Sequence, residues 1–84
     1  MNKRKQLAKL LAGSTGIRFA EAVSVAESVG FELKRTSGSH HILFCEGIPE
    51  LLNLQDVKGE AKPYQVRQLV KLIEKYNLQI QEAE

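Results

Sequence analysis

The sequence predicts an α+β domain in which a three-stranded antiparallel sheet is covered on one face by helices. Apolar residues recur at helical spacing near both ends of the 84-residue chain, and an alternating stretch with a glycine-containing turn lies between them. A sheet with one apolar face needs a cover, which the flanking helices supply. A chain this short buries only about 60–65% of its unfolded surface. We therefore expect a single domain over residues 1–84, with a modest core and a shallow site.

The N-terminal third of the chain predicts two helices. Three leucines at i, i+3, i+4 spacing predict a short amphipathic helix over residues 3–12, within an N-terminal segment 1–13. The run Gly13-Ser14-Thr15-Gly16 breaks it. A second apolar stripe that includes Phe19, Val23 and Ala26 predicts a helix over residues 18–29, and Gly30 follows as a stop signal.

The middle of the chain predicts a β-hairpin and one further strand. Phe31 and Leu33 alternate with Glu32 and Lys34, which is typical of a half-buried strand. A Ser-Gly-Ser turn leads from this strand into an apolar one. The expected boundaries are strand 31–36, turn 37–39, strand 40–45, loop 47–50, strand 52–57 and a polar connection at 59–62.

The last predicted helix begins at Pro63, because proline is well tolerated in the first helical turn. An apolar stripe follows, and basic residues at i, i+4, i+8 spacing occupy another face. The stripe consists of Val66, Leu69, Val70 and Ile73, and the basic row of Arg67, Lys71 and Lys75. The domain core is expected over residues 18–78, with an acidic tail at 79–84.

Composition and charge narrow the class of protein. One cysteine, Cys45, excludes an internal disulfide and fits a reducing cytosol, and its apolar strand favours a core position. No apolar run approaches the roughly 20 residues of a membrane span, and the basic start lacks the pattern of a signal peptide. We therefore expect a cytoplasmic protein. Residues 1–18 and 58–75 are basic, which fits either solvated helix faces or a phosphate-binding surface.

The two histidines of the chain, His40 and His41, are adjacent. Neighbouring strand residues point to opposite faces, so the pair cannot easily bind one metal ion. Ser39 precedes His40, but no strand–turn–helix nucleophile elbow surrounds it. A single histidine can still act as general acid or base on RNA, whose 2′-hydroxyl is a built-in nucleophile. The alternative is that both histidines merely fill the start of a strand.

Two segments resemble the HicA family of toxins from bacterial toxin–antitoxin pairs. Residues 29–42 contain the Gly-aromatic end of a helix, a basic strand and then Gly38-Ser39-His40, and Lys62–Leu69 looks like the start of the family's last helix. The resemblance covers residues 18–78. In place of the Val-Pro-x-His stretch of many members, residues 53–59 read NLQDVKG.

The resemblance implies a fold like the double-stranded-RNA-binding domain and ribosome-independent mRNA cleavage. It implies that His40 is the catalytic histidine, whereas His41 matches a more variable position. It also implies a HicB-type antitoxin that binds the toxin and covers the histidine.

The leading hypothesis is a toxin endoribonuclease that needs neither a metal nor another cofactor. His40 would act as base for the 2′-hydroxyl or acid for the leaving 5′-oxygen, and a second group or water would serve the other step. Gly38 would let the turn approach RNA, and Ser39 could bind a phosphate oxygen. Expected phosphate contacts are Lys34, Arg35, Lys58, Lys62 and Arg67. The alternatives are a non-catalytic RNA-binding module of the same fold and an interaction protein that depends on its partner for stability.

Overall fold

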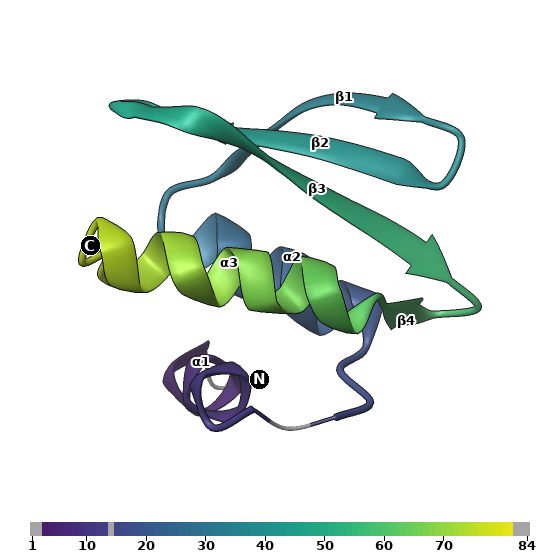
Figure 1. Cartoon of the computed structure of the whole chain (residues 1–84), viewed down its shortest axis with the longest axis horizontal. Coiled ribbons are helices and arrows are strands. Elements are labelled where there is room, and N and C mark those ends of the chain that lie inside the picture. The colour runs from purple at the N-terminus through teal and green to yellow at the C-terminus, as the bar shows by residue number, and fades with distance from the viewer. Residues whose placement is uncertain (1–2, 14, 82–84) are drawn as a thin grey trace.

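A computed structural model describes residues 3–13 and 15–81, in which three helices accompany a four-stranded antiparallel sheet (Figure 1). The α+β class expected from the sequence is confirmed. The elements are α1 (Lys3–Leu11), α2 (Phe19–Ser28), β1 (Glu32–Ser37), β2 (His40–Cys45), β3 (Ile48–Val57), β4 (Glu60–Ala61) and α3 (Pro63–Lys75). The two acids of the predicted tail, Glu82 and Glu84, lie outside the described residues.

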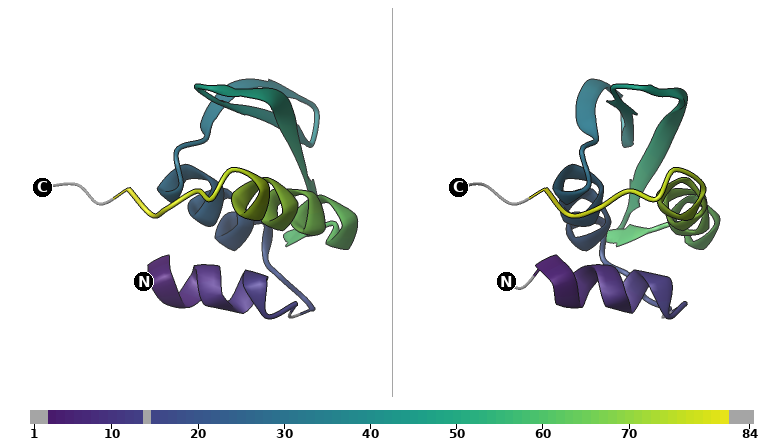
Figure 2. Two further views of the ribbon diagram at one scale, coloured as in Figure 1. Left: turned by 60° about the vertical axis from the view of Figure 1, so that its left-hand side comes forward. Right: turned by 90° about the vertical axis from the view of Figure 1, so that its left-hand side faces the viewer.

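The elements form layers. Helices α2 and α3 lie side by side beneath one face of the sheet, and α1 packs below them on the side away from the sheet (Figures 1 and 2). No described element covers the opposite face of β1, β2 and β3, which we call the open face. Within residues 3–13 and 15–81, no helix has the length and apolar character needed to cross a membrane.

The helices agree closely with the apolar periodicity. Helix α2 begins after Arg18, whose backbone N–H donates to the Glu21 carboxylate (3.1 Å). A glutamate at the third helical position often accepts this bond. This bond and the Lys9 ammonium lower the pKa of Glu21. Lys9 reaches Glu21 from α1 at 3.3 Å, and Ser24 of α2 donates to Gln6 of α1. These contacts, together with buried Leu10, hold α1 against α2.

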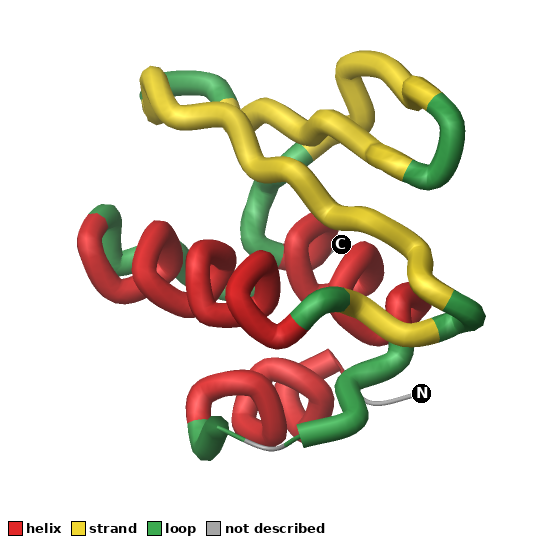
Figure 3. Tube along the Cα trace, turned by 45° about the vertical axis from the view of Figure 1, so that its right-hand side comes forward, coloured by secondary structure: helices red, strands yellow, loops and turns green. Residues whose placement is uncertain are grey.

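The sheet has the strand order β1-β2-β3-β4, so the expected three-stranded sheet gains a fourth short strand. Strand β4 lies in the segment predicted as a polar connection. A two-residue turn joins it to β3, and its Ala61 N–H donates to the Ile17 carbonyl ahead of α2 (3.0 Å). Figure 3 shows the segment that precedes α2 running beside β4. Two residues directly after a glycine are too short for a periodic signal, which is why the sequence did not indicate this strand.

Strand β3 begins at Ile48, so the loop predicted at 47–50 was wrong for all but Gly47. Ile48 pairs with Cys45 across a two-residue turn, and Gly47 supplies the positive φ (+87°) there. Pro49 signalled a loop because it lacks a backbone N–H. It lies where the register shifts between Leu43 and Cys45, so the ladder does not need its missing donor.

Strand β1 is exposed along its whole length, contrary to the expectation of a half-buried strand. Phe31 precedes the strand and is buried, whereas Leu33 is 52% exposed. The register shifts between Leu33 and Arg35, and β1 is the edge strand farthest from α3 (Figure 1). Alternation therefore indicated the strand but not its burial.

The core lies between the sheet and the helices. It consists of Leu10, Ile17, Ala22, Val25, Ala26, Val29, Phe31, Leu43, Cys45, Leu52, Leu54, Ala61, Val66, Leu69, Leu72 and Ile73. The predicted core position of Cys45 is confirmed, and burial raises the pKa of its thiol.

Near the turn between β2 and β3, the Glu50 carboxylate accepts hydrogen bonds from Lys75 (2.7 Å) and Tyr76 (2.5 Å), which lower its pKa to about 2.

Candidate active site

The turn between β1 and β2 presents the two histidines. Ser37 pairs with His40, so Gly38 and Ser39 alone form the connection. Gly38 has a φ of +60°, and an added Cβ there would meet no atom within 4 Å. A positive φ at the first position suits a two-residue hairpin turn, and glycine adopts it without strain. The turn is therefore tight and small, with His40 as the first residue of the following strand.

Strand alternation places the histidines on different faces, as expected. Residues paired across two strands share a face, and Leu43 and Leu52 form a buried pair. His41, two residues from Leu43, belongs to that helix-covered face. Its ring lies 4.7 Å from the ring of Phe19 in α2, and its Nδ1 lies 3.2 Å from the Ser39 carbonyl. His41 is therefore part of the packing between β2 and α2.

His40 is half-buried and lies on the open face, because it alternates with the buried face that carries Leu43. It pairs with Gln55 of β3, and its Nδ1 lies 3.2 Å from the Asn53 side-chain oxygen. Among the contacts described for the imidazole, this is the one to a side chain. The ring therefore stands on the face of the sheet that points away from the helices, at the end that carries the β1–β2 turn.

Amide side chains tie this end of the sheet to α3. Gln55 donates from its side chain to the Ser39 hydroxyl (3.2 Å) and from its backbone to the side-chain oxygen of Gln65 (2.7 Å). Gln65 is 1% exposed and lies in the first turns of α3. The Ser39 carbonyl also accepts from the Asp56 N–H (3.0 Å). The hairpin turn, β3 and the start of α3 are thus connected by hydrogen bonds.

The cationic residues expected at the site occupy different positions relative to His40. Arg35 pairs with Ile42, which shares the open face with His40, whereas Lys34 lies at the register shift of β1. Lys58 occupies the β3–β4 turn with a φ of +54°. Lys62 immediately precedes α3, and its ammonium lies 5.9 Å from the ring centroid of exposed Tyr64.

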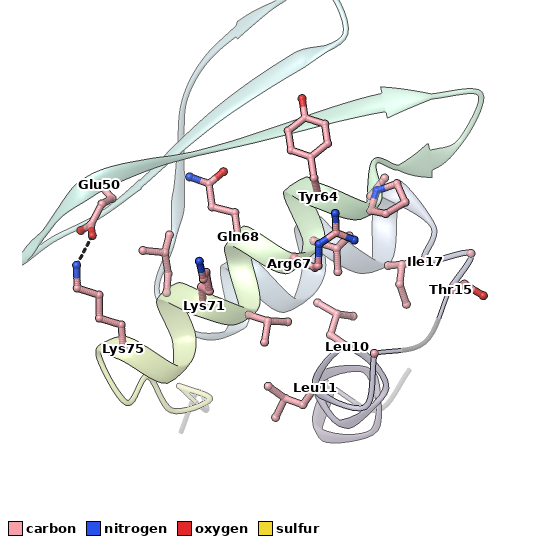
Figure 4. A pocket seen from close by; sticks show the side chains of 17 residues that line it. Leu10, Leu11, Thr15, Ile17, Glu50, Tyr64, Arg67, Gln68, Lys71 and Lys75 are labelled. Carbon is pink, nitrogen blue, oxygen red and sulfur yellow. Dashed lines mark hydrogen bonds and ion pairs between the residues drawn. The ribbon is translucent and has the colours of Figure 1, made fainter.

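Arg67 lines a separate groove on the helical side of the molecule. The groove has a volume of about 980 Å³ and lies between α3, the end of α1 and the segment after α1 (Figure 4). Apolar side chains such as Leu10 and Leu11 line it together with Arg67 and Lys71. His40 is not among its lining residues. The structure therefore brings Gly38, Ser39, His40 and Arg35 to one end of the sheet but does not bring Arg67 to the imidazole.

Sequence reasoning did not single out Asn53 or Gln55, the two amides beside His40. A usable signal was present, because both alternate with the apolar Leu52 and Leu54 in β3. A polar residue between core positions of a strand faces away from the core. The register that brings these amides to His40 depends on where β3 begins, and the sequence placed that start four residues too late.

The chain is similar to a known protein family. A model described as the HicA toxin of bacterial toxin-antitoxin pairs matches residues 19–75, from the start of α2 to the end of α3. The match includes His40 and its surroundings, whereas α1 precedes it. Neither the curated proteins nor the solved structures contain a match to the chain.

Proposed function

Because the chain belongs to the HicA family of toxins of bacterial toxin–antitoxin pairs, we propose that it is an endoribonuclease that cleaves mRNA. His40 is the catalytic histidine in this proposal, and no metal or other cofactor takes part. The observation that carries it is the position of the imidazole. It stands on the open face of the sheet, beside a two-residue turn that a nucleic acid backbone can approach.

The proposed reaction is transfer of the phosphoryl group within the RNA strand. His40 removes the proton of a 2′-hydroxyl, and the 2′-oxygen attacks the adjacent phosphorus. The bond from phosphorus to the 5′-oxygen breaks, and that oxygen takes a proton from water or a second group. The products are a 2′,3′-cyclic phosphate and a 5′-hydroxyl. The His40 imidazole thus serves the first of the two proton transfers, and water or a second group serves the other.

Residues around the turn would hold the substrate. Gly38 allows close approach, and Ser39 offers a hydroxyl to a phosphate oxygen. Arg35, on the same face as His40, is the cation best placed for the phosphate next to the cleaved bond. The other proposed backbone contacts are Lys34, Lys58, Lys62 and Arg67. Such contacts position the strand without selecting its sequence.

Family membership also implies an antitoxin partner. We propose that a HicB-type antitoxin covers the open face and so blocks His40. Phe44 and Leu51, 36% and 42% exposed, offer apolar contact area on that face, toward the end of the sheet opposite His40. The site of action proposed is the cytoplasm, where mRNA is present.

Purified wild type and His40→Ala, each incubated with an RNA transcript and with DNA of the same sequence, test the proposal. With a chelator present, wild type should cut only the RNA and leave 2′,3′-cyclic phosphate ends, and the variant should cut neither. Induced expression should arrest growth with wild type alone. Cleavage by the alanine variant would remove His40 from the catalytic role. RNA retardation on a gel by both proteins without any cleavage would favour the RNA-binding module instead.

A further inference from the structure

We propose that Asn53 is a positioning residue, which holds His40 in the tautomer that leaves Nε2 free to accept a proton. The inference rests on the proposed function for its catalytic meaning, but it makes a claim about the imidazole that can be measured without RNA.

The register of the sheet brings the two side chains together. His40 pairs with Gln55 and Ile42 pairs with Asn53, so Asn53 lies diagonally across from His40 on the same face. Diagonal neighbours on antiparallel strands are within reach of long or planar side chains. The separation of 3.2 Å between His40 Nδ1 and Asn53 Oδ1 is at the long end of the hydrogen-bond range. Both residues are half-buried, so water competes only partly for this bond.

The Asn53 side-chain oxygen faces Nδ1. An amide oxygen only accepts hydrogen bonds, so in this arrangement Nδ1 carries the hydrogen. A neutral imidazole has one ring hydrogen, and Nε2 is then left with its lone pair. When Nε2 takes up a proton, Nδ1 keeps its hydrogen, and the bond to Asn53 persists. The same contact therefore orients the ring before and after proton transfer.

The neighbouring His41 provides an internal comparison. Its Nδ1 lies 3.2 Å from the Ser39 carbonyl oxygen, which also only accepts, so the same tautomer is expected there. That contact is made within the turn and does not involve Asn53. Removal of the Asn53 amide should therefore change one histidine and leave the other unchanged.

Nitrogen-15 correlation spectra of the two imidazoles, recorded on wild type, Asn53→Ala and Asn53→Asp at a pH where both rings are neutral, test the inference. Wild type should show Nδ1–H for both rings. In Asn53→Ala, His40 should shift toward the Nε2–H form that a free imidazole prefers, while His41 stays unchanged. Asn53→Asp keeps an acceptor oxygen at the same position and should restore the Nδ1–H form. An Nε2–H form of His40 in wild type, or no change in Asn53→Ala, would overturn the inference.

Cleavage kinetics form the second arm of the test. Misorientation of the base should lower kcat on the order of 10- to 100-fold in Asn53→Ala and leave KM unchanged, because Asn53 is not a proposed phosphate contact. An unchanged kcat despite an altered tautomer would show that Asn53 does not position the base for catalysis. If wild type does not cleave RNA at all, the proposed function fails, and the tautomer measurement still decides whether Asn53 controls the ring.

Discussion

His40 and His41 are the same side chain at adjacent positions, yet they belong to different parts of the molecule. His41 faces the helices, where its ring contacts Phe19 and its Nδ1 lies beside the Ser39 carbonyl. His40 faces outward from the sheet and contacts Asn53. The residue type therefore does not determine the role. The face of the strand does, and the same contrast continues along β3, where Leu54 is fully buried and Leu51 is 42% exposed.

The largest difference between the two faces should appear in catalysis. His40→Ala should lower the single-turnover rate of RNA cleavage by about 10²–10⁴-fold, the usual contribution of a general acid or base. His41→Ala should stay within about threefold of wild type, because its ring is not on the proposed substrate face. Rapid-quench assays at saturating protein measure both. Equal losses in the two variants would contradict the division of roles.

The core and open faces of β3 should differ next, in stability. Leu54→Ala removes a side chain with 0% exposure and should lower the free energy of unfolding by about 2–5 kcal/mol. Leu51→Ala, with the same chemistry on the same strand, should lower it by less than about 1 kcal/mol. Urea unfolding followed by circular dichroism measures both, with Leu54→Val as the milder variant if the alanine protein does not fold. A larger loss of stability in Leu51→Ala than in Leu54→Ala would contradict the assignment of the core to the Leu54 face of β3.

The packing role of His41 should give a smaller effect. His41→Ala should lower the free energy of unfolding by about 0.5–1.5 kcal/mol, through loss of its tilted contact with Phe19. A double-mutant cycle with Phe19→Leu isolates the coupling between the two rings. Coupling close to zero would mean that the ring contact does not contribute to the docking of α2 on the sheet.

The smallest expected effect concerns Glu50 and its partners Lys75 and Tyr76, at the end of the sheet opposite His40. The pKa of Glu50 is lowered from 4.5 to about 2, so its contribution to stability is present above about pH 4.5 and is lost as the pH falls toward 2. Glu50→Gln should therefore lower the Tm slightly at pH 7 and reduce the decline in Tm between pH 5 and 2. Scanning calorimetry over this range measures it. Parallel pH dependences in the two proteins would show that the bonds to Lys75 and Tyr76 add no net stability.

Elements of the fold with a strong period were predictable from the sequence. The stripe Val66, Leu69, Val70 and Ile73 defined α3, and the Ser-Gly-Ser signal located the hairpin, with β2 found at the expected residues. The start of β3 and the whole of β4 were not predictable in this way. A register shift accommodates Pro49, and β4 depends on the distant Ile17 carbonyl for one of its hydrogen bonds.

The candidate site divides in the same way into residues that a local pattern predicts and residues that it does not. His40, Gly38 and Ser39 follow from a local motif, and strand alternation separates His40 from His41. Asn53 and Gln65 reach the site only through the register of β3 and the docking of α3, which no local pattern contains. Arg67 appeared beside the other cations in the charge pattern, but it lines the groove next to α1. The spacing of charges along a helix predicts which residues share a face, but it does not predict which other elements lie next to that face.

The two-residue turn between β1 and β2 has a consequence for how firmly the two histidines are distinguished. Slippage of β2 by one residue would exchange them, and the outward histidine would then be His41. The exchange would also turn Leu43 and Cys45 out of the core and bring Phe44 into it. The burial of Leu43 and Cys45 therefore stabilises the observed register against slippage. Which of two chemically identical neighbours meets the solvent is decided by side chains that face the opposite way.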